Sequence, residues 1–291
     1  MNVLELQDVT KNYGDFVLDK VSFEVPEGGI CGFIGQNGAG KTTTIQLILD
    51  IVRKDAGEIR VFGSSTEDKE ALALHKQDIG VVYDEMGFHD FLTPTEIGKM
   101  MKLIYRNWDD AVYKKYLETF GLPSGKPCGK FSRGMRMKLQ IAVAMSHHAR
   151  LLIMDEPTSG LDPIVRNEIL QIFQEFVLEE NHTILLSSHI TGDLERIADE
   201  VVFIDRGKIV LVGNKDEILQ RHGLMKCRKE ELEKVDQEDV VSVRSGSFSA
   251  EVLVKDREAC RRKYPGFMME QPSLEDVMLF YVSGKQAEVK A

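Results

Sequence analysis

The segment GQNGAGKT, residues 35–42, constrains the fold more than any other part of this 291-residue chain. It matches the pattern G-x-x-x-x-G-K-[ST] and lies between an apolar run, GGICGFIG, and a helical pattern, KTTTIQLILDIV. In that setting glycines let backbone N–H groups approach phosphate oxygens, and the helix N-terminus adds a favourable dipole. The alternative is an ordinary glycine turn, but a chance match in such a chain has a frequency of roughly 1%. The segment therefore predicts a phosphate-binding loop.

The residues of this phosphate loop have separate expected roles. The Lys41 side chain is long enough to contact the β- and γ-phosphates, and the Thr42 hydroxyl is a ligand for Mg²⁺. We therefore expect ATP and Mg²⁺ as cofactors. The residues expected to bind ATP are Gly35, Gln36, Asn37, Gly38, Ala39, Gly40, Lys41, Thr42 and Thr43.

A second apolar strand, LLIMDEP at residues 151–157, ends in two carboxylates. Because ligands bind at the carboxyl ends of parallel strands, Asp155 is expected to bind the metal. Glu156 is expected to polarise a water for attack on the γ-phosphate. The alternative is a solvated acidic turn after a core strand, and the phosphate loop upstream favours the catalytic interpretation.

Strand and helix patterns alternate along most of the chain, which predicts an α/β fold whose parallel sheet is covered on both faces. Residues 1–25 instead alternate apolar and polar side chains, as an antiparallel β region does. The stretch from Pro94 to Phe120 has helical apolar spacing. The fold class expected is therefore a P-loop core with an antiparallel N-terminal region and a helical subdomain.

The change of pattern near residue 213 predicts a second, smaller unit. We expect a P-loop ATPase domain over residues 1–220, with its helical subdomain at about 88–148. An α+β accessory domain is expected over residues 224–285, and residues 286–291 are expected to form a loose tail.

Composition argues against several functional classes. The formal net charge of −10, with no basic stretch to offset it, argues against nucleic acid as a partner. No apolar run approaches the ~20 residues of a membrane-spanning helix, and the N-terminus MNVLELQDVT lacks the features of a signal peptide. Because the four cysteines are far apart, we expect reduced thiols, no metal cluster and a cytosolic chain.

The segment KFSRGMRMKLQIAVAM, residues 130–145, predicts by itself only an amphipathic helix with Ser132 as N-cap. Its place in the chain adds more. The phosphate loop, SRGM, LLIMDEPTSGLDP and SSH follow one another in an order that resembles the ATP-binding subunit of an ABC transporter. The resemblance covers roughly residues 1–220. It implies ATP hydrolysis coupled to transport by a pair of ATPase subunits, either identical or paralogous.

The resemblance assigns a role to the helix tip, which comprises Ser132, Arg133, Gly134 and Met135. In the family this tip closes over ATP that is held by the phosphate loop of another subunit. Ser132 and Gly134 match the family pattern. Arg133 replaces the more usual glycine, and Met135 replaces the usual glutamine.

Three more residues gain expected roles from the resemblance. Tyr13 would stack on adenine, Asp162 would belong to a loop that crosses the dimer, and His189 would contact the γ-phosphate during catalysis. Each has a structural alternative. Tyr13 could be a packing aromatic, Asp162 a helix N-cap, and His189 a hydrogen-bonded strand-end histidine.

The strand IGVV, residues 79–82, runs into an acidic turn. In the resembled family this strand ends in a glutamine that contacts Mg²⁺ and the attacking water, and here Asp84 has that place. A carboxylate ~5 Å from a unit charge interacts by about 3 kcal/mol at an effective dielectric of 20, so attraction to Mg²⁺ and repulsion from the triphosphate are comparable. We expect Asp84 to face the metal and hydrolysis to be retained with altered metal dependence. A solvated turn residue is the alternative.

A transport role implies separate transmembrane subunits and a place at the cytoplasmic face of the cell membrane. The loop residues Phe88–Leu92 are the expected dock, and the apolar stripe of the helix that follows is either part of this dock or the core of the helical subdomain. The chain is similar to exporter ATPases of small Gram-positive systems, some of which export amphipathic peptides. We therefore expect export of an amphipathic peptide or a hydrophobic, antimicrobial compound. Two other classes stay open: a soluble ABC-type ATPase that acts on ribosomes or DNA, and a nucleotide-gated scaffold with little turnover.

Overall fold

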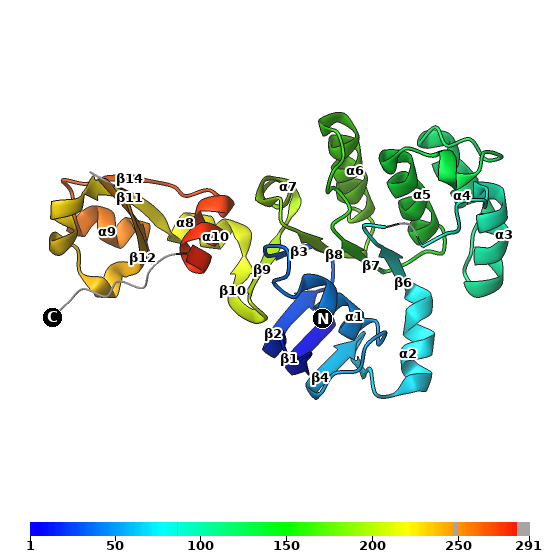
Figure 1. Ribbon diagram of the computed structural model, residues 1–291, viewed down its shortest axis with the longest axis horizontal. Coiled ribbons are helices and arrows are strands. Elements are labelled where there is room, and N and C mark those ends of the chain that lie inside the picture. Colours follow the sequence, from blue (N-terminus) through cyan, green and yellow to red (C-terminus); the bar gives the residue numbers. More distant parts are fainter. Residues whose placement is uncertain (86, 247–248, 284–291) are drawn as a thin grey trace.

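The computed structural model describes residues 1–85, 87–246 and 249–283, and the expected tail at 286–291 lies outside them. The protein consists of three parts along its longest axis (Figure 1). The central part contains two sheets, a helical part lies at one end, and a smaller part with a sheet of its own lies at the other.

The central part is built on a six-stranded sheet of order β10-β9-β3-β8-β7-β6. Its strands are β3 (Gly29–Ile34), β6 (Ile79–Val82), β7 (Leu151–Asp155), β8 (Thr183–Ser188), β9 (Glu200–Asp205) and β10 (Lys208–Asn214). All neighbours are parallel except β9 and β10, which form a hairpin. The predicted α/β class is confirmed. Because parallel strands end at one edge of a sheet, the loops that follow β3, β6, β7 and β8 are brought together there.

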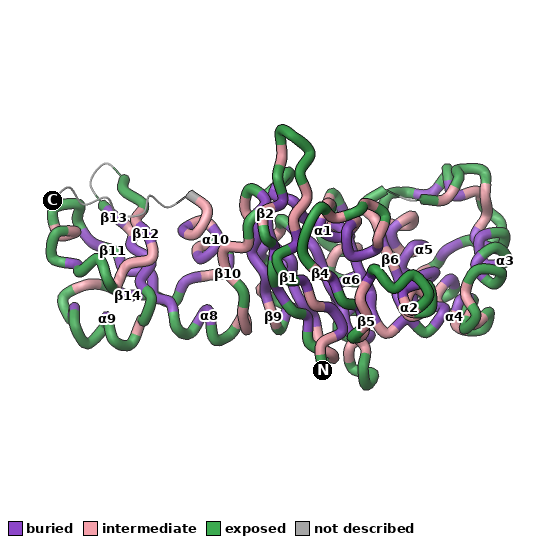
Figure 2. The backbone as a smooth tube through the Cα atoms, turned by 90° about the horizontal axis from the view of Figure 1, so that it is seen from below, coloured by how far each residue is buried: buried purple, intermediate pink, exposed green. Residues whose placement is uncertain are grey.

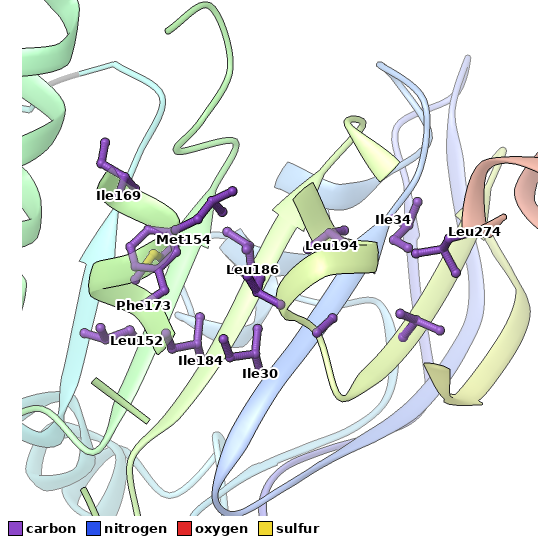
Figure 3. Packing of buried hydrophobic residues seen from close by; sticks show 14 of the residues in the cluster. Ile30, Ile34, Leu152, Met154, Ile169, Phe173, Ile184, Leu186, Leu194 and Leu274 are labelled. Carbon is purple, nitrogen blue, oxygen red and sulfur yellow. The ribbon is translucent and has the colours of Figure 1, made fainter. Parts of the chain in front are cut away.

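Side chains of the central strands alternate between two buried clusters, one on each face of the sheet. In β3, Ile30 and Ile34 join one cluster, and Cys31 and Phe33 join the other. The flanking helices are α1 (Lys41–Ile48), α6 (Pro163–Phe176) and α7 (Thr191–Ile197). Figure 3 shows Phe173 of α6 packed over the first face, and Figure 2 shows many buried residues in the central part. Each such side chain contributes about 2 kcal/mol by leaving water, which makes the sheet a firm base for its loops.

The antiparallel region predicted at the N-terminus is a second sheet, of order β2-β1-β4-β5. Its strands are β1 (Asn2–Asn12), β2 (Val17–Pro26), β4 (Ala56–Val61) and β5 (Ser64–Ser65), and α2 (Lys69–His75) leads from it towards β6. Burial alternates along β2, with Val21, Phe23 and Val25 inside and their neighbours outside. This sheet covers the same face of the central sheet as α1.

The helical part contains α3 (Pro94–Ile104), α4 (Asp110–Thr119) and α5 (Arg133–Met145). Two sequence signals divide the helical pattern into separate helices. Thr93 and Glu96 form a capping box at the start of α3, and the Asp109 carboxylate accepts hydrogen bonds from the first N–H groups of α4. The three helices enclose a small apolar cluster of their own around Ile97 and Leu139.

The C-terminal part contains α8 (Lys215–Arg221), α9 (Arg257–Lys263), α10 (Leu274–Ser283) and a sheet of order β12-β13-β11-β14. The strands are β11 (Gly223–Arg228), β12 (Val240–Ser245), β13 (Ser249–Val254) and β14 (Met268–Glu270). Four short 3₁₀ turns occupy Lys76–Asp78, Cys128–Lys130, Lys229–Lys234 and Gln237–Asp239.

The last helix joins the C-terminal part to the ATPase core. Ser273 and Asp276 bond each other's side chain and backbone at the start of α10. Leu274, Val277 and Phe280 are then buried in the same cluster as the sheet residues of the central part (Figure 3). The four cysteines are free and buried. Within the described residues, no helix has the length and apolar character that crossing a membrane requires.

Candidate active site

The phosphate loop connects β3 to α1 and needs glycine at its last position. Gly40 has a φ of +116°, and a Cβ atom there would lie 2.9 Å from Leu18 Cδ1 and 3.1 Å from Phe16 Cζ. A larger residue would therefore meet both backbone strain and steric overlap. A cavity of about 390 Å³ lies over the loop; its lining residues are Phe16, Asn37, Gly38, Gly40, Lys41, Thr42, Thr43 and Glu156.

The Lys41 ammonium lies inside the loop. Its side chain is 5% exposed, and Nζ donates to the carbonyl oxygens of Gly35 (2.6 Å) and Gln36 (3.2 Å). Nζ also lies 3.0 Å from Glu156 Oε1, as an ion pair without hydrogen-bond geometry. The structure thus brings together the predicted phosphate-binding cation and the predicted base.

Asp155 and Thr42 also meet, as a metal site of this kind requires. Thr42 Oγ1 donates to one oxygen of the buried Asp155 carboxylate (2.7 Å), and Ser187 Oγ donates to the other (2.6 Å). Mg²⁺ is commonly held by one or two carboxylates together with substrate phosphates, and these are oxygen donors beside the phosphate cavity. The residues therefore fit a magnesium ion that binds with the nucleotide. Within the described residues, no group of three or more His, Cys, Asp or Glu side chains forms a metal site by itself.

Glu156 has an unusual backbone conformation for its residue type. Its φ is +53°, a region that costs a non-glycine residue of order 1 kcal/mol and is concentrated at functional sites. Its N–H donates to Ser187 Oγ (3.1 Å), and its Oε2 lies 2.7 Å from His189 Nδ1. The carboxylate therefore lies between a lysine and a histidine, at the cavity where a γ-phosphate would bind.

The helix tip is built as a helix N-terminus and lies outside this cavity. Ser132 is exposed, and its hydroxyl accepts a hydrogen bond from the Met135 N–H (3.2 Å). Asp162 is likewise exposed and caps α6 through the N–H groups of Ile164 and Val165 (both 3.1 Å). None of the four tip residues is among the described residues that line the phosphate cavity. Within one chain, the two predicted halves of the ATP site do not meet.

An aromatic residue without a predicted role, Phe16, lines the phosphate cavity. Tyr13 is 50% exposed, lies beside Lys11 and does not line the described cavity. Phe16, three residues later in the same turn, lines it and lies against Gly40. Stacking on adenine by Tyr13 stays a prediction, and Phe16 is a second candidate.

Asp84 follows β6 but bonds a residue that the sequence did not associate with it. Its carboxylate accepts a hydrogen bond from the Arg133 guanidinium of the helix tip. The contact between Asp84 and a metal stays a prediction. One residue earlier, both backbone groups of Tyr83 bond the side chain of Gln140, which is buried in α5.

Three residues of the site received no role from the sequence: Ser187 opens the SSH motif, whereas Phe16 and Gln140 lie in no motif. Ser187 lies in the apolar strand β8, Phe16 lies in a short turn, and Gln140 lies on the buried side of α5. A polar residue at a buried helical position is the signal by which Gln140 could have been found, because buried amides need partners.

A glycine cradle before α1, a lysine within it and paired carboxylates after β7 define a P-loop nucleotide hydrolase. The sequence profile of the ABC transporter family matches residues 18–159. The bacitracin transport ATP-binding protein BcrA of Bacillus licheniformis is 38% identical over 215 residues, which cover 72% of this chain and 68% of that protein. The linearmycin resistance ATP-binding protein LnrL of Bacillus subtilis (strain 168) is 32% identical over 263 residues, covering 88% of this chain and 83% of that protein.

A solved ATP-binding cassette shares the fold. It is a dimer in a post-hydrolysis state, bound to ADP and phosphate. Its TM-score is 0.65 at 20% identity, covering 73% of this chain and 98% of that one. The chain belongs to the family of ATP-binding subunits of ABC transporters, as its motif order predicted. It binds nucleotide and is an ATPase, and members of this family act in pairs and with transmembrane subunits.

Proposed function

We propose that two ATPase subunits trap ATP between the phosphate loop of one and the helix tip of the other. Two observations support this. Ser132 and Arg133 of the tip are exposed, the tip lies outside the phosphate cavity of its own chain, and the similar solved cassette is a dimer. ATP bound at such an interface favours the closed pair by its higher affinity for that state, and hydrolysis releases it. The partner is a second copy of this chain or a paralogue.

The proposed chemistry uses the residues that meet at the cavity. Lys41 contacts the β- and γ-phosphates, Glu156 polarises the attacking water, and His189 orients Glu156 and contacts the γ-phosphate. A magnesium ion held by Thr42 and Asp155 would neutralise phosphate charge. The observation that carries this proposal is the position of Glu156 between Lys41 and His189.

We place the docking site for transmembrane subunits at Phe88–Leu92 and the adjoining helix α3. Phe91 is 72% exposed, whereas Phe88 and Leu92 pack partly against the helical cluster. On α3, Leu103 is 88% exposed, and Met100 and Ile104 are also exposed. Exposed apolar side chains along one segment make it a candidate interaction site. Docking there would hold the chain at the cytoplasmic face of the membrane.

The proposed cargo is an amphipathic peptide or another antimicrobial compound, exported through those membrane subunits. The support comes from relatives, one named for bacitracin transport and one for linearmycin resistance. Direction and cargo can be tested in cells, by co-expression with a membrane subunit and measurement of resistance to such compounds.

The ATPase proposal is tested with the purified chain and a Glu156→Gln variant. We expect turnover to fall by about 100-fold or more, because the general base is lost, while ATP binding is retained. Glu168→Gln is the matched control, since Glu168 is an acidic surface residue of α6 that pairs with Lys138. Equal turnover in wild type and Glu156→Gln would contradict the assignment. Negligible turnover in the wild type, with intact ATP-driven pairing, would favour the nucleotide-gated scaffold.

A further inference from the structure

Asp84 and Arg133, two departures from the family pattern, are each other's partner. Arg133 Nη2 donates to Asp84 Oδ1, although the residues are 49 positions apart in sequence. Each side chain is about half exposed, so the pair lies at the surface of the site and not in the core. What looked like two separate exceptions in the sequence is one contact in the structure.

Asp84 belongs to a row of carboxylates at one edge of the sheet. β6 and β7 are neighbouring parallel strands, so Asp84, two residues beyond the end of β6, follows the same edge of the sheet as Asp155 and Glu156. Asp84 therefore adds a third negative charge beside the proposed triphosphate site.

Each carboxylate of this row has a partner from another segment of the chain. The pairs are Asp155 with Thr42 and Ser187, Glu156 with Lys41 and His189, and Asp84 with Arg133. Within the described residues, no second cation is paired with Asp84. Removal of Arg133 would therefore leave one uncompensated carboxylate at this edge.

The structure fixes Arg133 on two sides. Its guanidinium packs against Gly160, where a Cβ atom would lie 3.0 Å from Cζ. Gln140, seven residues later on α5, accepts from the Tyr83 N–H (3.3 Å) and donates to the Tyr83 carbonyl (3.0 Å). Residues seven apart lie on the same face of a helix, so α5 holds the end of β6 at two points. Arg133 is thereby kept beside Asp84.

We propose that Arg133 is a positioning residue that neutralises Asp84 and so allows a carboxylate to stand at the edge of the ATP site. The inference rests on the proposed function, because it requires the nucleotide to bind at the phosphate loop. Without Arg133, Asp84 would repel the triphosphate. At a partly exposed site, where water and salt screen the charge, the expected effect on ATP affinity is about five-fold.

The test is titration of each variant with a fluorescent ATP analogue and Mg²⁺, with circular dichroism as a check on folding. Arg133→Gln should weaken binding by about five-fold, whereas Arg133→Lys, which keeps the charge, should retain most of the affinity. Asp84→Asn combined with Arg133→Gln should bind more tightly than Arg133→Gln alone, because the repelling charge is gone. Lys138→Gln is the matched control. It removes a cation from the same helix, but one that pairs with Glu168 of α6.

The double variant Asp84→Asn with Arg133→Gln decides between two roles of the contact. If the contact were only structural, the double variant would bind the ATP analogue no more tightly than Arg133→Gln alone. That result would overturn the inference, and so would unchanged affinity in Arg133→Gln. Neither outcome affects the proposed function, which depends on the loss of turnover in Glu156→Gln. If neither the wild-type chain nor any variant bound the ATP analogue, the proposed function and this inference would both be contradicted.

Discussion

The proposed ATP site has a phosphate-loop side and a helix-tip side, and one chain by itself holds the residues of the first in place but not those of the second. On the phosphate-loop side, Lys41 and Asp155 are buried, and Glu156 is held by contacts with Lys41 and His189. On the helix-tip side, the Ser132 hydroxyl is exposed and bonds only the backbone of its own helix among the described residues. The first half is preorganised, whereas the second presents its polar groups outward.

This difference shows which groups of the site are in place before ATP binds and which need a second chain. Groups fixed by burial and mutual bonds need little reorganisation when ATP binds, so their contribution is available to each chain alone. In the proposed pair, Ser132 gains its ligand contacts when a second chain approaches. Variants of the phosphate-loop side should therefore weaken binding by the monomer, and variants of Ser132 should weaken pairing; Arg133 is a separate case, because its partner Asp84 lies in its own chain.

The largest expected effect is loss of nucleotide binding in Lys41→Ala. Removing the ammonium takes away the charge that contacts the β- and γ-phosphates, so affinity for ATP should fall by about 100-fold. Ser132→Ala should leave binding by the monomer near the wild-type value and abolish ATP-driven pairing. Equilibrium dialysis measures the first property, and light scattering measures the second. Equal loss of binding in both variants would erase the distinction between the halves.

The next effect concerns the adenine side of the phosphate cavity. Because Phe16 lines the cavity and Tyr13 does not, Phe16→Ala should raise the ATP concentration for half-saturation by about ten-fold, as loss of one base stack does. Tyr13→Ala should have a smaller effect. The reverse order, measured by nucleotide titration, would restore Tyr13 as the stacking residue.

Asp162→Ala separates a structural role from one that depends on the second chain. Loss of the α6 cap should cost about 1 kcal/mol in the free energy of unfolding. Asp68→Ala removes an equivalent cap from α2 and should cost a similar amount. Only Asp162→Ala should also lower ATPase turnover. Denaturant unfolding and a phosphate-release assay give the two readouts, and equal turnover in both variants would leave Asp162 as a cap alone.

The smallest effect is acid destabilisation of the helical part. His147, at the end of α5, is buried against Tyr105, and burial lowers its pKa from 6.5 to about 4. The unfolded chain therefore binds more protons between these pH values, so this contribution to stability is complete above pH 6.5 and declines as pH falls towards 4. At pH 5.5 the loss is about 1 kcal/mol.

His147→Phe, which preserves a ring against Tyr105, should flatten the pH dependence of unfolding between pH 7 and 5.5. His148→Gln is its control, since His148 is exposed and lies 3.6 Å from Asp109. His222 in the C-terminal part, whose pKa is also lowered by burial, adds a background of the same sign that both variants share. A slope in His147→Phe equal to that of wild type would contradict the account.

Local patterns in the sequence predicted local structure well. The bounds of β6 match the predicted strand at residues 79–82, because its apolar run is bounded by turn residues on both sides. The cap of α10 joins Ser273 to Asp276, at the three-residue spacing that marks a helix start in a sequence. The phosphate loop, Asp155 and Glu156 were placed because strand order and motif spacing determine which loops share an edge of the sheet.

Contacts between segments that are distant in the chain could not be predicted from a single sequence. Nothing in KFSRGM shows that Arg133 bonds Asp84, because periodicity describes one helix and not its neighbour. Helix α10 packs its buried face into the ATPase core, and its apolar pattern would be the same if it packed only on the accessory domain. The contrast between Phe16 and Tyr13 is of the same kind, since either aromatic could lie at the cavity.

The most direct test of a site shared between two chains mixes two inactive variants, Lys41→Ala and Ser132→Ala. In a mixed pair the intact phosphate loop of one chain faces the intact helix tip of the other, so one complete site forms. The account predicts that ATPase turnover, near background for each variant alone, recovers on mixing to at most about half of the wild-type rate, since only mixed pairs close over ATP and each has one of two sites. No recovery, or full turnover by a strictly monomeric chain, would contradict it.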